Sequence, residues 1–74
     1  MRQQLPAFSG NRFLRLPLVM AKTGLGRSSV YRLMATGAFP KSVSIGAQSV
    51  AWLEADVEAW ITSRVSAANP ASDL

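Results

Sequence analysis

The sequence predicts a mainly helical fold with one small β-hairpin, in the order helix, helix, hairpin, helix. Three observations lead to this prediction. Helical periodicity is interrupted at Gly24, an alternation of apolar and small polar residues runs from Lys41 to Trp52, and helical periodicity returns after Leu53. Two helices joined by a tight turn form a helix-turn-helix, and a hairpin directly after the second helix is a wing. The predicted fold class is therefore a winged helix-turn-helix.

The first helix is expected to begin at Pro17, because a proline in the first turn has no N–H that needs a partner. Before it, the segment Phe13–Leu16 is predicted to be short and extended. Leu16, Val19 and Met20 supply the apolar side of this helix.

The turn and the second helix follow from the stretch A-K-T-G-L-G-R-S-S-V-Y-R-L-M. Gly24 is expected to end the first helix in the left-handed conformation, Leu25 to plug the space between the helices, and Gly26 to cap the second helix. Gly37 is expected to end the second helix, and Phe39-Pro40 favours an extended backbone after it. The apolar side of the second helix is Val30, Leu33 and Met34.

The hairpin and the third helix complete the predicted domain. Val43 and Ile45, then Val50 and Trp52, alternate with small residues on either side of a turn at Gly46-Ala47-Gln48. A helix from Glu54 to about Val65 is expected to close the core. One helical stripe is shared by Leu53, Val57, Trp60, Ile61 and Arg64, and Trp60 is expected to be the main anchor.

The outer side of the second helix is the candidate binding surface. Ser28, Tyr31 and Arg32 lie opposite the apolar side on a helical wheel, and Arg27 stands near the amino end, where such a helix meets base edges. Polar residues opposite an apolar stripe are usually a solvated face, but their place after a helix-turn favours DNA binding. The predicted DNA-binding residues are Arg27, Ser28, Ser29, Tyr31, Arg32, Lys41 and Gln48.

Charge is segregated along the chain. Of eight basic residues, all but Arg64 precede position 42, and the four acidic residues all follow position 53. A polyanion is the partner that such a distribution suggests, although small basic proteins without nucleic-acid function exist.

Composition argues against several other classes of protein. A chain of 74 residues makes one domain, expected at 13–65 between a flexible arm at 1–12 and a flexible tail at 66–74. The absence of Cys and His removes disulfides, thiolate metal sites and the commonest general base. No apolar run approaches the roughly 20 residues of a membrane span, so a cytoplasmic protein without membrane contact is expected.

Chemistry-bearing residues do not converge on a catalytic or metal site. Glu54, Asp56 and Glu58 are expected to complement the dipole at the start of the third helix, and Trp52 and Trp60 to pack in the core rather than stack on bases. Ser28 and Ser29 have no base beside them in the sequence pattern. We therefore expect no enzyme, no cofactor and no metal.

Three sequence elements occur together in a recognisable order: T-G-L-x-R-S-S-V-Y-R, G-x-F-P-K and W-L-E-A-D-V-E-A-W. From about Phe13 to Arg64 the chain resembles the AlpA family of phage and prophage regulatory proteins. The resemblance implies a winged helix-turn-helix similar to MerR domains and excisionases. It also implies sequence-specific binding of double-stranded DNA, as a transcription regulator or as a recombination directionality factor. A transcription regulator would have RNA polymerase as its protein partner, and a recombination directionality factor would have an integrase.

Departures from the family pattern concern the helix starts and the wing. Leu18 stands where relatives commonly have an acidic residue, and Gly26 where they have a Ser cap. Arginines that many relatives have in the wing are replaced by Gln48 and Ala51, which leaves Lys41 as the charge nearest the hairpin.

Monomers that cooperate on adjacent DNA sites are expected. The alternative function is a protein-protein interaction module on the same scaffold.

Overall fold

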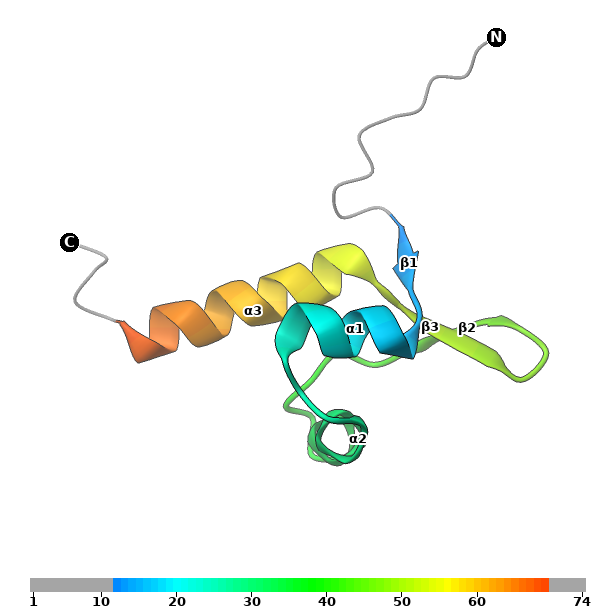
Figure 1. Ribbon diagram of the computed structural model, residues 1–74, viewed down its shortest axis with the longest axis horizontal. Coiled ribbons are helices and arrows are strands. Elements are labelled where there is room, and N and C mark those ends of the chain that lie inside the picture. Colours follow the sequence, from blue (N-terminus) through cyan, green and yellow to red (C-terminus); the bar gives the residue numbers. More distant parts are fainter. Residues whose placement is uncertain (1–11, 70–74) are drawn as a thin grey trace, which may run out of the picture.

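The computed structural model describes residues 12–69, so all of the predicted arm but Arg12, and residues 70–74 of the predicted tail, lie outside the described residues. The expected fold class is confirmed: a mainly helical chain with one small antiparallel sheet (Figure 1). The elements are β1 (Phe13–Leu14), α1 (Leu16–Thr23), α2 (Arg27–Ala35), β2 (Val43–Gly46), β3 (Ser49–Leu53) and α3 (Glu54–Ala68).

The sheet has three antiparallel strands in the order β1-β3-β2. The extended segment before α1 is shorter than expected, and its strand pairs with β3 through Phe13 opposite Leu53 and Leu14 opposite Trp52. Nothing in the local sequence pattern indicated this pairing. It places the start of α1 beside the wing, which is the feature that matters for the binding surface.

The turn between α1 and α2 is built as the glycine pattern predicted. Gly24 is left-handed, with φ 77° and ψ 5°, and its N–H donates to the carbonyl of Met20. Thr23 adds a contribution that the sequence analysis did not anticipate. Its hydroxyl donates to the carbonyl of Val19 (2.8 Å) and accepts the N–H of Leu25 (3.1 Å), so it bridges the end of α1 and the turn.

Gly26 caps α2 with an extended backbone and no side-chain hydrogen bond, as its lack of a side chain requires. After α2, Gly37 is left-handed with φ 80°. Two indole N–H groups then hold the connection to β2. Trp60 donates to the carbonyl of Ala38 at 2.7 Å, and Trp52 donates to the carbonyl of Pro40 at 3.2 Å.

The hairpin turn is tighter than the expected Gly46-Ala47-Gln48 connection. Gly46 belongs to β2 and pairs with Ser49, so the turn consists of Ala47 and Gln48. The left-handed residue in this turn is Gln48, with φ 59°. The register also shifts between Ser44 and Gly46, as in a β-bulge, which disrupts the alternation on which the strand prediction was based.

The core lies between the sheet and the three helices. Trp52 is completely buried and is the largest fully buried side chain, whereas Trp60, expected to be the main anchor of α3, is only half-buried. Trp60 lies at the rim because its indole reaches back to the backbone of Ala38. The buried cluster consists of Leu14, Val19, Val30, Phe39, Trp52 and Val57.

Helix α3 extends away from the sheet, at the opposite end of the molecule from the hairpin (Figure 1). It reaches Ala68, beyond the expected end at Val65. The helix stops at Asn69, which precedes a proline and adopts φ −131° and ψ 60°, because a residue before proline disfavours the helical conformation. Within residues 12–69, no helix combines the length and the apolar character needed to cross a membrane.

Candidate nucleic-acid interface

Helix α2 has the two-sided character that the sequence predicted. Val30 is fully buried, and Leu33 and Met34 pack against the core from the same side. Arg27, Ser28 and Arg32 are exposed, whereas Ser29 is half-buried on the flank of the helix. The most outward positions of α2 are therefore those of Ser28 and Arg32, because they lie farthest from Val30 on the helical wheel.

Tyr31 does not stand free of the core, which corrects its expected placement opposite the apolar side of α2. Its side chain is 41% exposed, yet its ring meets the ring of buried Trp52 edge-on, with centroids 6.4 Å apart. The guanidinium carbon of Arg27 lies 6.0 Å from the centroid of the Tyr31 ring. Trp52 thus supports Tyr31, and Tyr31 in turn orients Arg27 by a cation–π contact.

A hollow lies between the start of α2, the start of α1 and the hairpin. We call it the helix-wing hollow. Its polar lining consists of Arg15, Arg27, Tyr31 and Gln48, and its apolar lining includes Val50 and Trp52. Arg27, Tyr31 and Gln48 were among the predicted site residues, and the fold brings these three together.

Arg15 is the lining residue that sequence reasoning missed. It caps α1 through its extended backbone, and its exposed side chain forms no ion pair within the described part of the chain. The signal available in the sequence was an arginine directly before the helix-starting Leu16-Pro17, a place fixed in space only by the pairing of β1 with β3.

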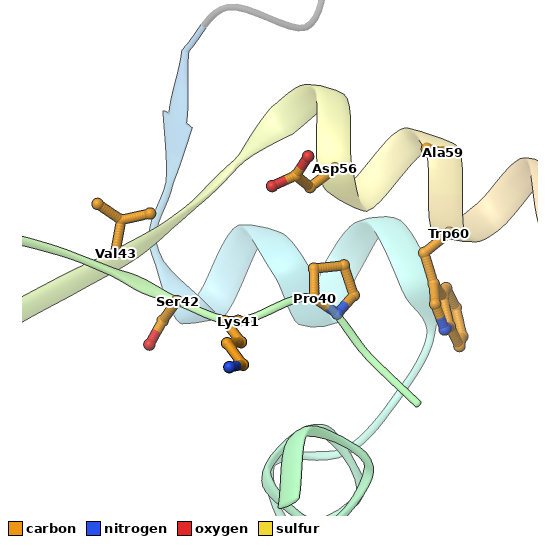
Figure 2. A pocket seen from close by; sticks show the side chains of 7 residues that line it. All are labelled: Pro40, Lys41, Ser42, Val43, Asp56, Ala59 and Trp60. Atoms are coloured by element: carbon orange, nitrogen blue, oxygen red, sulfur yellow. The ribbon is translucent and has the colours of Figure 1, made fainter. Parts of the chain in front are cut away.

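Lys41 is not part of the helix-wing hollow. It lines a separate open groove with Pro40, Val43, Asp56 and Trp60, between the connection to β2 and the first turns of α3. Its side chain extends away from Asp56 (Figure 2), and no ion pair joins the two residues.

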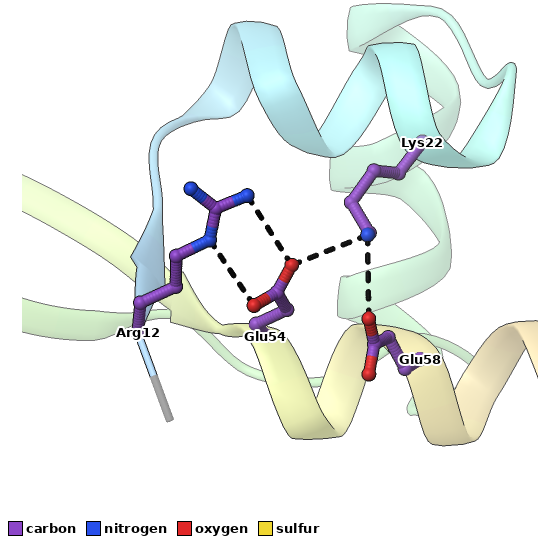
Figure 3. A network of polar contacts seen from close by, with 4 residues as sticks. All are labelled: Arg12, Lys22, Glu54 and Glu58. Atoms are coloured by element: carbon purple, nitrogen blue, oxygen red, sulfur yellow. Dashed lines mark hydrogen bonds and ion pairs between the residues drawn. The ribbon is translucent and has the colours of Figure 1, made fainter. Parts of the chain in front are cut away.

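Two basic residues of the front of the chain are neutralised by α3. Arg12 donates to Glu54 at 3.1 Å, and Lys22 donates to Glu54 at 3.2 Å and to Glu58 at 3.3 Å (Figure 3). The hydrogen bond that Lys22 donates to Glu54, followed by the one it donates to Glu58, raises the pKa of Lys22 above its usual 10.5. Glu54 therefore does more than complement the helix dipole: it joins the segment before β1 to α1 and α3.

The other cations that the structure describes in the amino-terminal half are not compensated. Arg15, Arg27, Arg32 and Lys41 are all exposed and have no acidic side chain within ion-pair distance among residues 12–69. The acidic residues described lie on α3, where Glu54 is buried under Arg12 and Lys22. Positive charge is thus concentrated on the part of the molecule formed by α1, α2 and the connection to the wing.

The family model of the prophage CP4-57 regulatory protein (AlpA) matches residues 12–65, which include every element from β1 through most of α3. This chain belongs to the AlpA family.

Two relatives are similar in sequence to this AlpA-family protein. An uncharacterised protein, ORF88 of enterobacteria phage P4, is 47% identical over 62 residues, which cover 84% of this chain and 70% of the relative. The DNA-binding transcriptional activator AlpA of Escherichia coli K12 is 41% identical over 64 residues, which cover 76% of this chain and 89% of the relative. The expected family is therefore confirmed.

Proposed function

We propose that this AlpA-family protein binds double-stranded DNA in a sequence-specific manner and regulates transcription of a phage or an integrative element. Helix α2 acts as the recognition helix in the major groove. The observation that carries the proposal is the exposed face of α2, where Arg27, Ser28 and Arg32 follow a helix-turn and have no acidic partner in the region described. Arginine is suited to this role because its guanidinium can donate to guanine O6 and N7 together.

One of the two relatives supports the same function. The E. coli relative is named a DNA-binding transcriptional activator. That name favours transcription regulation over the second role that the resemblance implies, recombination directionality. Either role is exercised on bacterial DNA, and so in the cytoplasm of the host.

The salt dependence of DNA binding tests this proposal directly. Sites selected from a random duplex library give the preferred sequence, and fluorescence anisotropy then gives its affinity as salt is varied. The three uncompensated cations other than Arg32, namely Arg15, Arg27 and Lys41, predict a slope of log K against log salt near −2.7 if each neutralises about one phosphate. Arg32→Ala should lower affinity for the preferred site by about 1 to 3 kcal/mol and relax the preference at one base pair.

Arg64→Ala is the matched control, because Arg64 lies on α3 with its guanidinium carbon 5.9 Å from the Trp60 ring. It should leave both affinity and slope unchanged. A flat salt dependence on duplex DNA, or recovery of no preferred sequence, would contradict the proposal and favour the protein-protein interaction module.

A further inference from the structure

The helix-wing hollow is lined by two arginines that come from different parts of the chain and have no acidic partner among residues 12–69. Arg27 is the first residue of α2, and Arg15 is the cap of α1. Tyr31 and Gln48 line the same hollow and add a hydroxyl and an amide as hydrogen-bonding groups. Such a set fits an anionic oxygen-rich group far better than an apolar ligand.

The geometry of duplex DNA indicates what would occupy the hollow. The major and minor grooves are separated by a single sugar-phosphate backbone. A protein with its recognition helix in one groove and its hairpin over the next must therefore straddle that backbone. In this molecule the surface between α2 and the hairpin is the helix-wing hollow.

On this basis, and resting on the proposed function, we propose that the helix-wing hollow binds a phosphate of the DNA backbone between Arg15 and Arg27. Arg27 is held for this contact by its position over the Tyr31 ring. Arg15 is a binding residue from outside the helix-turn-helix, placed there by the pairing of β1 with β3. The contact positions α2 in the major groove without itself distinguishing one base pair from another.

The experiment compares Arg15→Ala with wild type and with Arg64→Ala on the selected duplex. Among residues 12–69, Arg15 takes part in hydrogen bonds through its backbone carbonyl, which accepts from the N–H groups of Leu18 and Val19, so the substitution should leave the melting temperature unchanged. Loss of one phosphate contact should weaken binding about fivefold at 0.15 M salt and reduce the salt slope by about 0.9, on preferred and random duplexes alike.

A set of duplexes in which one phosphate at a time is replaced by a neutral methylphosphonate then locates the contact. At one backbone position, and only there, the replacement should weaken wild-type binding more than it weakens binding by Arg15→Ala, because that variant keeps only the contact from Arg27. If Arg15→Ala binds DNA with the same affinity and the same salt slope as the wild type, this inference is overturned and the proposed function still stands. The inference is also overturned if the loss of affinity caused by Arg15→Ala is the same on every methylphosphonate duplex. Absence of salt-dependent binding by the wild type would overturn both proposals.

Discussion

At the scale of single residues, the main lesson concerns Tyr31. An exposed aromatic on a recognition helix suggests a side chain dedicated to DNA, but this ring rests on buried Trp52 and supports Arg27. Its role is therefore partly structural. A helical wheel could not show this, because the contact depends on where β3 lies relative to α2.

Tyr31→Ala is expected to lower the free energy of unfolding by about 1 to 2 kcal/mol, through loss of the aromatic pair and its buried area. It should also weaken DNA binding, because Arg27 loses its support. Tyr31→Phe keeps the ring and should retain wild-type stability in urea denaturation.

The coupling between Tyr31 and Arg27 is measured by a double-mutant cycle on DNA affinity. If Tyr31 acts through Arg27, the loss in the double variant is smaller than the sum of the two single losses. Strictly additive losses would mean that Tyr31 and Arg27 act independently.

At the scale of elements, periodicity and glycine placement predicted the order of helices and hairpin, the left-handed Gly24 and the cap at Gly26. Those features are local, so a single sequence contains the information that determines them. The pairing of β1 with β3, the irregular register of β2 and the rim position of Trp60 depend on contacts between distant segments. Arg15 was not among the predicted site residues for the same reason, because its place depends on the pairing of β1 with β3.

The two tryptophans illustrate how element packing changes a prediction. The sequence predicts Trp60 as the main anchor of α3, but Trp60 is half-buried and Trp52 is completely buried. Trp52→Ala is therefore predicted to be the more destabilising substitution, by about 3 to 5 kcal/mol, enough to unfold a domain of this size.

Trp60→Phe separates the packing of Trp60 from its hydrogen bond to Ala38. It retains an aromatic ring against Phe39, whose centroid lies 5.0 Å from that of Trp60, and loses the N–H donor. The expected loss is about 1 kcal/mol, measured by urea denaturation followed by circular dichroism. A Trp60→Phe variant as unstable as Trp52→Ala would show that Trp60 is the principal anchor after all.

At the scale of the whole molecule, Glu54 joins three segments that are distant in sequence. Its carboxylate is 6% exposed and accepts from Arg12 and Lys22, while its own N–H donates to the carbonyl of Arg12 at 2.8 Å. Glu54→Gln is predicted to reduce the free energy of unfolding by roughly 1.5 to 3 kcal/mol, the range for hydrogen bonds to charged groups.

Glu58→Gln is the matched control, because Glu58 is 44% exposed and forms an ion pair with Lys22 alone among the residues described. A surface pair of this kind contributes under about 1 kcal/mol, so equal losses in the two variants would contradict the role assigned to Glu54. Because the pKa of Lys22 is raised in the folded state, its stabilising contribution is complete below 10.5 and is lost only as pH rises through that raised value. Denaturation at neutral pH therefore measures the intact network.

The left-handed backbone of Gln48 has a consequence for how the wing tip can change. Glycine would adopt this conformation without the penalty of about 1 kcal/mol that a residue with a Cβ incurs. A glycine, however, would remove the amide from the helix-wing hollow. Stability and the proposed DNA contact thus favour different residues at position 48, and glutamine keeps a polar side chain in the lining of the hollow at the expense of a strained turn.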